Sequence, residues 1–135
     1  MSSILTSTLA PTLHVALGGA IGAVARYQLG RLVTHMAGPT ANFPWATLAA
    51  NVLGSLAMGL LFGLLARNGG ASDAVRLFLG VGLLGGFTTF SAFSLEMLQL
   101  IQRGSTGMAM TYALVSVLAG LAALYLGLLV MRGAA

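Results

Sequence analysis

Hydrophobic residues dominate four long stretches of the chain, and short polar segments separate them. The stretches without Arg, Lys, Asp or Glu are residues 1–25, 32–66, 77–95 and 104–131. A helix that spans a bilayer needs roughly 20 apolar residues. The second stretch is too long for one span, and its segment 37–44 (AGPTANFP) is rich in turn-forming residues. The pattern therefore predicts four helices, at about 12–36, 44–66, 73–102 and 106–131. Pro11 and Pro44 fall where the first two begin, and proline is favoured in the first turn of a helix.

The composition places these helices in a membrane. Hydrophobic residues make up 58% of the chain and charged residues only 6%, whereas a soluble domain has about 25% charged residues. Six basic and two acidic side chains cannot solvate the surface of a 135-residue globule. There is no Cys, which excludes a disulfide scaffold. We therefore predict an all-α integral membrane protein with one four-helix domain, residues 1–135.

The arginines divide evenly between the two expected ends of the bundle. One end has Arg67, Arg76 and Arg132, and the other has Arg31, Arg103 and, if it snorkels to the interface, Arg26. Membrane orientation follows an excess of Lys and Arg on one side, so an even division does not select an orientation. Such a chain can insert both ways and pair as an antiparallel homodimer. The charge pattern alone leaves open whether this one does.

Acidic and basic groups are too sparse for catalysis. The carboxylates and imidazoles are His14, His35, Asp73 and Glu96, which lie far apart in the sequence. No pair has the spacing of metal ligands or of a general acid and base, and no nucleophile has a neighbouring base. An enzyme is therefore not expected.

The first predicted helix has small residues and one arginine at intervals of four. Gly18, Gly22, Arg26 and Gly30 lie on one ridge. The glycines are typical of a helix–helix packing surface. An arginine within the apolar run favours a functional position in the bundle or a wet cavity, although snorkelling to an interface is the alternative.

The second predicted helix repeats this interval with polar residues, at Thr47, Asn51 and Ser55. A Thr or Ser hydroxyl can bond to a carbonyl of the preceding turn. The Asn51 amide needs several partners where there is no water. A hydrogen bond between helices and a contact with a transported ligand both remain open for Asn51.

The third predicted helix contains a segment unsuited to a continuous helix. Gly85 and Gly86 precede Phe87, Thr88 and Thr89, and glycines followed by β-branched residues are poor helix formers. The segment lies near the middle of 73–102, so we expect helix 3 to be broken near the membrane midplane. Broken helices at that depth are buried or line a cavity. A glycine-rich packing surface is the alternative.

The remaining polar groups of the spans favour a small anion as ligand. Phe90 and Phe93 share one face, and although such a stripe is usually core, aromatic edges carry partial positive charge. The fourth helix adds Tyr112 and Ser116, one turn apart. Hydroxyls, an amide and ring edges suit a strongly hydrogen-bonding anion better than a cation.

Three segments together resemble the Fluc (CrcB) family of fluoride channels. They are 18–27 (GGAIGAVARY), 44–55 (PWATLAANVLGS) and 85–96 (GGFTTFSAFSLE). Two departures are Ala46, where Gly is common, and Ala92, where Thr is frequent. The resemblance spans nearly the whole chain, and it implies a dual-topology antiparallel homodimer with two fluoride pores in a microbial cytoplasmic (inner) membrane.

The resemblance also implies roles for individual residues. Phe90 and Phe93 hold fluoride, Asn51 is a pore donor, and Arg26 draws anions into a vestibule. Other residues expected beside the fluoride path are Thr47, Ser91, Ser94, Tyr112 and Ser116. A structural Na⁺ is expected at the centre of the dimer, held by backbone carbonyls of Gly85 and Thr88 from both copies.

Two other functional classes remain as alternatives. A small dual-topology multidrug exporter is also four-helical, but such carriers hold a carboxylate in helix 1, where this chain has none. A structural proteolipid would only pack against partners.

The expected function is passive export of fluoride, which enters as neutral hydrogen fluoride and is trapped when the acid dissociates.

Overall fold

The computed structural model describes residues 2–38, 42–67, 69–70 and 72–133, with side chains from residue 8 onward. This part of the chain is helical and contains no strand. The long helices are α1 (Ser2–Ala37), α2 (Trp45–Arg67) and α6 (Thr106–Gly133). Between α2 and α6 lie α3 (Asp73–Val75), the π-helix η1 (Arg76–Leu84), α4 (Gly85–Phe87) and α5 (Phe90–Gln102).

Four helical segments in the described residues are long and apolar enough to cross a membrane, as the hydropathy pattern predicts. They are Thr8–Ala37, Trp45–Arg67, Asp73–Gln102 and Thr106–Gly133. The bounds of the second, third and fourth segments lie within two residues of those expected. The protein is therefore of the multi-pass membrane type.

The start of the first helix differs from our expectation. We predicted that this helix begins near residue 12, with Pro11 in its first turn, but α1 begins at Ser2 and contains Pro11. A proline inside a helix removes one backbone hydrogen bond, but its fixed φ is itself helical. The apolar and hydroxyl residues before Pro11 continue the helix, so Pro11 was the wrong signal for its start.

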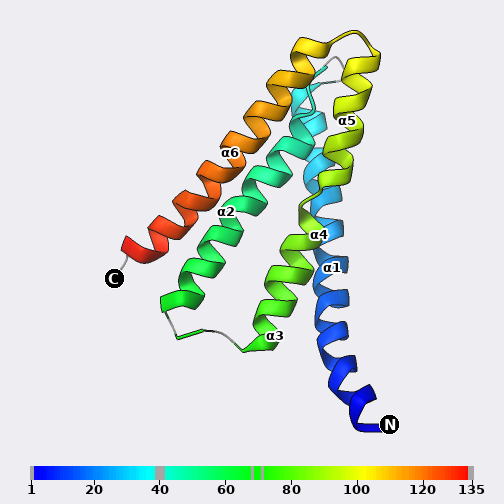
Figure 1. The fold of residues 1–135 in the computed structure, drawn as a ribbon. Coiled ribbons are helices and arrows are strands. Elements are labelled where there is room, and N and C mark those ends of the chain that lie inside the picture. The colour runs from blue at the N-terminus through cyan, green and yellow to red at the C-terminus, as the bar shows by residue number, and fades with distance from the viewer. Residues whose placement is uncertain (1, 39–41, 68, 71, 134–135) are drawn as a thin grey trace.

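The helices pair closely through glycines. Figure 1 shows α2 and α6 side by side, with α1 running along α3 and α4. A Cβ on Gly59 of α2 would lie 2.9 Å from the backbone carbon of Leu124 and 3.1 Å from the Cα of Gly127, both in α6. The missing side chain allows this approach, which matches the small-residue contacts of membrane helices.

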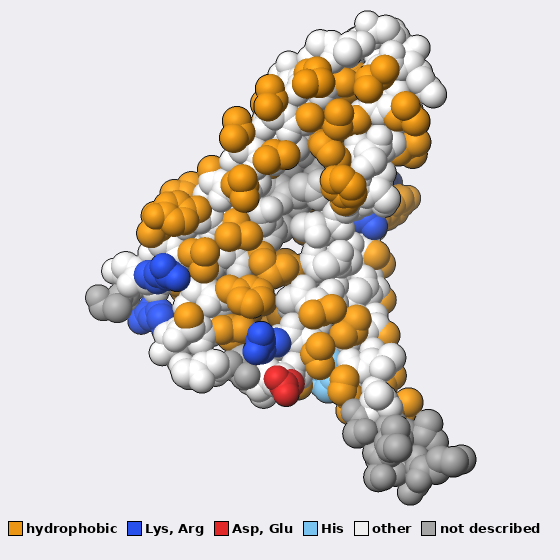
Figure 2. Space-filling model, in the orientation of Figure 1, with side chains coloured by type: hydrophobic (Ala, Val, Ile, Leu, Met, Phe, Trp, Pro, Cys, Tyr) orange, Lys and Arg blue, Asp and Glu red, His pale blue; other side chains and the backbone are white. Residues whose placement is uncertain are grey.

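Much of the apolar surface is exposed in the single chain. Figure 2 shows hydrophobic side chains over most of one face, while basic side chains gather toward the end that carries the α2–α3 connection. Met36 is 77% exposed and Phe90 is 78% exposed. The buried core is small and centres on Leu48, Leu100, Ala109 and the fully buried Tyr112. A surface of this kind requires an apolar environment.

Candidate functional site: an extended segment beside a line of polar and aromatic groups

Two residues of extended backbone, Thr88 and Thr89, separate α4 from α5, and we call this segment the break. Thr88 has φ −86° and ψ 157°, and Thr89 has φ −152° and ψ 123°. The Asn51 amide of α2 holds this segment from both sides, because Asn51 Nδ2 donates to the Thr89 carbonyl at 3.1 Å and Asn51 Oδ1 accepts from the Thr89 N–H at 2.8 Å. The Thr89 side chain then caps α5 by accepting from the Ala92 N–H at 3.2 Å. Asn51 therefore contacts the interrupted backbone directly.

These side-chain bonds release two backbone carbonyls. In a continuous helix the Gly85 carbonyl would accept from the Thr89 N–H, and the Thr88 carbonyl would accept from the Ala92 N–H. Here the Thr89 N–H donates to Asn51 and the Ala92 N–H donates to the Thr89 hydroxyl. Neither carbonyl therefore receives its helical hydrogen bond from these amides, and Gly85 is exposed in the single chain.

A second polar cluster joins α2, α5 and α6 around Glu96. Thr47 Oγ1 donates to Glu96 Oε1 at 2.7 Å, and Tyr112 Oη donates to Glu96 Oε2 at 2.8 Å. Thr47 is 8% exposed and Tyr112 is fully buried. Both oxygens of a carboxyl group within the apolar spans are thus hydrogen-bonded, as burial of such a group requires.

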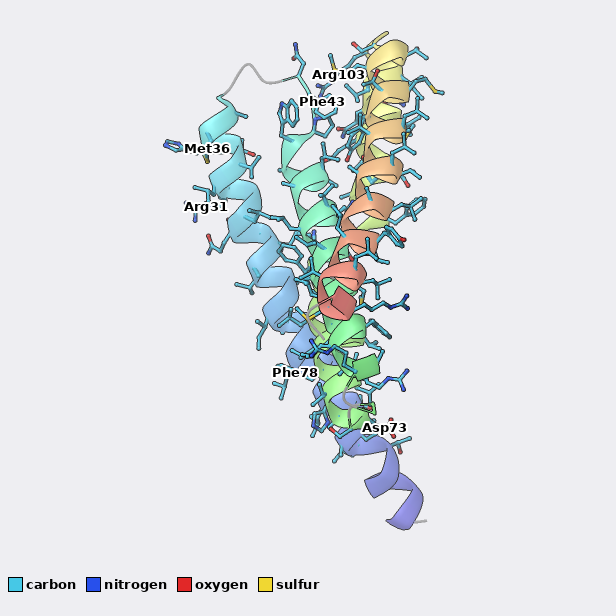
Figure 3. The ribbon with its side chains drawn as sticks, turned by 90° about the vertical axis from the view of Figure 1, so that its left-hand side faces the viewer. Arg31, Met36, Phe43, Asp73, Phe78 and Arg103 are labelled. Carbon is cyan, nitrogen blue, oxygen red and sulfur yellow. The ribbon has the colours of Figure 1, made fainter. Side chains whose placement is uncertain are left out.

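Aromatic rings connect the break to this cluster. The ring centroids of Phe90 and Phe93 are 5.7 Å apart, and those of Phe93 and Tyr112 are 5.0 Å apart. Phe43, which precedes α2, meets Tyr112 edge-on at 5.5 Å and an interplanar angle of 80°. Figure 3 shows Phe43 at the same end of the bundle as Arg103. The rings therefore form a line from the start of α5 toward that end of the molecule.

A cavity of about 380 Å³, which we call the central cavity, lies beside these rings. Its lining includes Asn51, Ser55, Phe90, Phe93 and Ser116. The Ser116 hydroxyl is buried and has no hydrogen-bond partner within the described chain. Buried polar groups are normally paired, so this hydroxyl remains available to a ligand in the cavity. The face in Figure 2 is visibly hollowed near the middle of the molecule.

Arg26 lies beside the extended segment between α4 and α5 and lines a second space. Its Nε donates to the Gly86 carbonyl at 3.2 Å. A larger hollow of about 1060 Å³, which we call the basic hollow, is lined by Arg26, Arg31 and His35 of α1 and also reaches Thr47 and Thr89. The basic hollow therefore joins cationic side chains to both the break and the Glu96 cluster.

Two predicted site residues bond locally instead. Ser91 is exposed, with its Oγ 3.3 Å from the Thr89 Oγ1. Ser94 is also exposed and donates to the Phe90 carbonyl of its own helix at 2.9 Å. Neither lines the central cavity. In the single chain these hydroxyls lie apart from the other predicted site residues.

Sequence reasoning assigned no role to two residues that the structure brings into the site. Apart from Asp73 at the start of the third predicted span, Glu96 is the only carboxylate in these spans, and such a group requires donors. That requirement does not identify the donor Thr47, which is 49 residues away. Phe43 had no signal, because it lies in the segment interpreted as a loop.

Comparison with known proteins identifies the family of the chain. A family model described as CrcB-like protein, Camphor Resistance (CrcB), matches residues 13–128. A protein of Novosphingobium aromaticivorans named fluoride-specific ion channel FluC is 61% identical over 124 residues, which cover 92% of this chain and 98% of that protein. Proteins with the same name from Erythrobacter litoralis and Caulobacter vibrioides are 54% and 50% identical, covering 93% and 89% of this chain and 97% and 94% of their own lengths. The chain belongs to the CrcB family, in which these relatives are named fluoride-specific ion channels.

Proposed function

We propose that the chain is a passive, fluoride-selective channel that exports fluoride from the cytoplasm and protects the cell against its toxicity. The observation that carries this proposal is the unpaired, buried Ser116 hydroxyl in the central cavity. The same cavity is lined by the Asn51 amide, which has one N–H beyond that given to Thr89, and by the rings of Phe90 and Phe93. Together they offer hydrogen-bond and ring-edge donors to an anion.

Selectivity follows from how such an anion loses its water. Fluoride binds water strongly, so a pore must replace that water with donors at close spacing. Thr47 and Tyr112 already donate to the carboxyl oxygens of Glu96. Rotation of either hydroxyl toward the pore lets fluoride take the place of a Glu96 oxygen as acceptor. The path we propose passes from the basic hollow along these hydroxyls to the phenylalanine rings and Ser116.

The second part of the proposal is the assembly, an antiparallel dual-topology homodimer with two pores. Phe90 is 78% exposed at the start of α5, although we assign its ring to a fluoride contact. A second copy of the chain on this face covers Phe90 and closes the open side of the central cavity. With Arg26 bonded to the Gly86 carbonyl inside the bundle, three arginines remain at one end and two at the other. This small difference gives the positive-inside rule little to act on and supports insertion in both orientations.

The third part is a structural Na⁺ between the two copies. The carbonyls of Gly85 and Thr88 fit this role, because the amides that would pair with them in a helix donate to side chains instead. Carbonyl ligands without a carboxylate suit a monovalent cation better than Ca²⁺ or Mg²⁺. A bound Na⁺ supplies positive charge near the anion path. Asn51 and Thr89 hold the carbonyl segment in place for it.

A bacterial cytoplasmic membrane is the location that this function requires, because hydrogen fluoride dissociates in the cytoplasm and the negative interior drives fluoride outward. A small multidrug-type exporter is less well supported, since α1 lacks a carboxylate. A structural proteolipid does not explain the unpaired Ser116 hydroxyl.

Fluoride efflux from liposomes tests the proposal. The purified protein is reconstituted in vesicles loaded with potassium fluoride, and valinomycin is added to let K⁺ leave. We expect rapid fluoride release and no comparable release from matched vesicles loaded with potassium chloride. A Ser116→Ala variant should release fluoride more slowly than the native chain. Fluoride release no faster than from protein-free vesicles would contradict channel function.

A further inference from the structure

The Gly86 carbonyl lies at the interruption between α4 and α5. In a continuous helix it would accept from the N–H of Phe90, but Thr88 and Thr89 are extended and α5 begins anew at Phe90. Arg26 Nε donates to this carbonyl at 3.2 Å, from a part-buried position 60 residues away in sequence. A side chain of α1 thus supplies a hydrogen bond at the place where the helix loses its own.

The glycines of α1 determine how close this arginine comes. A Cβ on Gly18 would lie 2.8 Å from the backbone nitrogen of Leu83, and one on Gly22 would lie 2.9 Å from the backbone nitrogen of Phe87. Real Cβ atoms essentially never approach so closely, so α1 packs against η1 and α4 only because these residues lack side chains. Arg26 is one helical turn after Gly22 and therefore lies beside the end of α4.

The charge of Arg26 suits this place as well. The C-terminal end of a helix carries partial negative charge, and a cation there is stabilising. The rest of the side chain lines the basic hollow. One residue is thus in contact with both the interrupted backbone and the space through which anions enter.

We propose that Arg26 is a positioning residue, whose Nε–H holds the Gly86 carbonyl and so fixes the backbone that carries Gly85, Thr88 and Phe90. This inference rests on the proposed fluoride conduction. It differs from attraction of anions by a distant charge, because a hydrogen bond at 3.2 Å requires a donor at one position on the side chain. Asn51 holds the other end of the same segment at Thr89.

An anion-attracting charge and a positioning residue differ in how fluoride flux depends on ionic strength and on fluoride concentration. An attracting charge raises the local anion concentration, so its loss changes the fluoride concentration that half-saturates flux. That change disappears at 1 M salt, where the Debye length is about 3 Å. A positioning group acts on the path itself, so its loss lowers the maximal rate at any salt concentration.

Arg26→Lys keeps the charge and removes the Nε–H donor. Initial fluoride efflux is measured over a range of fluoride concentrations, at low ionic strength and in 1 M potassium sulfate. We expect Arg26→Lys to lower the maximal rate by at least tenfold in both salts. Arg31→Gln is the matched control, because Arg31 lines the same hollow and points away from the bundle in Figure 3. Its effect should be confined to the half-saturating concentration at low salt.

A second variant tests the positioning role of Arg26 even if Arg26→Lys fails to fold. Arg26→citrulline, introduced by in vitro translation with a chemically charged suppressor tRNA, keeps the Nε–H and removes the charge. Its maximal rate should stay within threefold of the native rate. A native maximal rate in Arg26→Lys, or a tenfold loss in the citrulline variant, would overturn the positioning role. If the native protein itself conducts no fluoride in this assay, the proposed function fails and not only this inference.

Discussion

Replacing Tyr112 by Phe removes one hydroxyl and leaves the packing around it. The ring keeps its contacts with Phe93 and Phe43, at centroid distances of 5.0 Å and 5.5 Å. The hydrogen bond from Tyr112 Oη to Glu96 Oε2, at 2.8 Å, is lost. Glu96 then has one donor, Thr47, instead of two. We expect folding to be retained and conduction to fall.

The size of the effect follows from the kind of hydrogen bond. A hydrogen bond to a charged group contributes about 1.5–3 kcal/mol. Each 1.36 kcal/mol changes a rate by about tenfold. Since the proposed path requires this hydroxyl as a fluoride donor, Tyr112→Phe should lower fluoride flux by about tenfold to a hundredfold.

The assay is valinomycin-dependent fluoride efflux from liposomes, with protein content and gel-filtration profile matched between variants. Tyr125→Phe is the control, because Tyr125 lies on the same helix but is 59% exposed. It should conduct as the native chain does. Thr47→Val added to Tyr112→Phe should lower flux by less than the product of the two single effects, because both hydroxyls serve Glu96. Native flux in Tyr112→Phe would refute the assignment of this cluster to the fluoride path.

Three further predictions concern the rings, the packing and the orientation. Phe90→Ile and Phe93→Ile should each reduce fluoride efflux at least tenfold, because the ring edge is lost. Phe78→Ile in η1 is the control and should conduct normally. Equal efflux from all three variants would mean that Phe90 and Phe93 only pack in the core. Gly59→Ala should lower the free energy of unfolding by about 1–3 kcal/mol, measured by denaturation in detergent, because its Cβ would meet the α6 backbone. Gly30→Ala, whose Cβ meets nothing within 4 Å, should leave stability nearly unchanged, and equal losses in both would contradict the packing argument. Tags on the C-terminus should be found on both sides of the membrane. Two or three lysines added at the C-terminus should bias insertion and lower activity, and co-expression with an oppositely biased copy should restore it. One fixed orientation of the native chain would contradict the antiparallel dimer.

Sequence reasoning was strongest where the signal is local. Spans follow from runs of apolar residues, so the segments later found at Trp45–Arg67 and Thr106–Gly133 could be bounded within two residues. The start of α1 was predicted wrongly, because Pro11 has a helical φ and does not by itself end a helix. The π-helical form of Arg76–Leu84 was not predicted, because a single apolar stretch does not distinguish π from α hydrogen bonding.

The contacts of the candidate site depend on the fold and could not be read from spacing. The sequence showed that residues 85–89 are poorly suited to a continuous helix, but it did not show which side chains bind them. Asn51 is 38 residues before its partner Thr89, and Arg26 is 60 residues before its partner Gly86. The same holds for Thr47 and Glu96. For Asn51, the two alternatives left open by the sequence were a bond between helices and a ligand contact. The structure shows the first, and the second remains part of the proposed function.

The reversal potential of the reconstituted protein in a planar bilayer tests the central claim most directly. A tenfold fluoride gradient is imposed with equal Na⁺ on both sides. A passive fluoride channel should then give a reversal potential of magnitude about 59 mV, the value for a tenfold concentration ratio of one monovalent ion. A tenfold Na⁺ gradient imposed with equal fluoride should leave the reversal potential at zero, since the proposed Na⁺ is structural. Absence of fluoride current, or a reversal potential that follows the Na⁺ gradient, would contradict a passive fluoride channel.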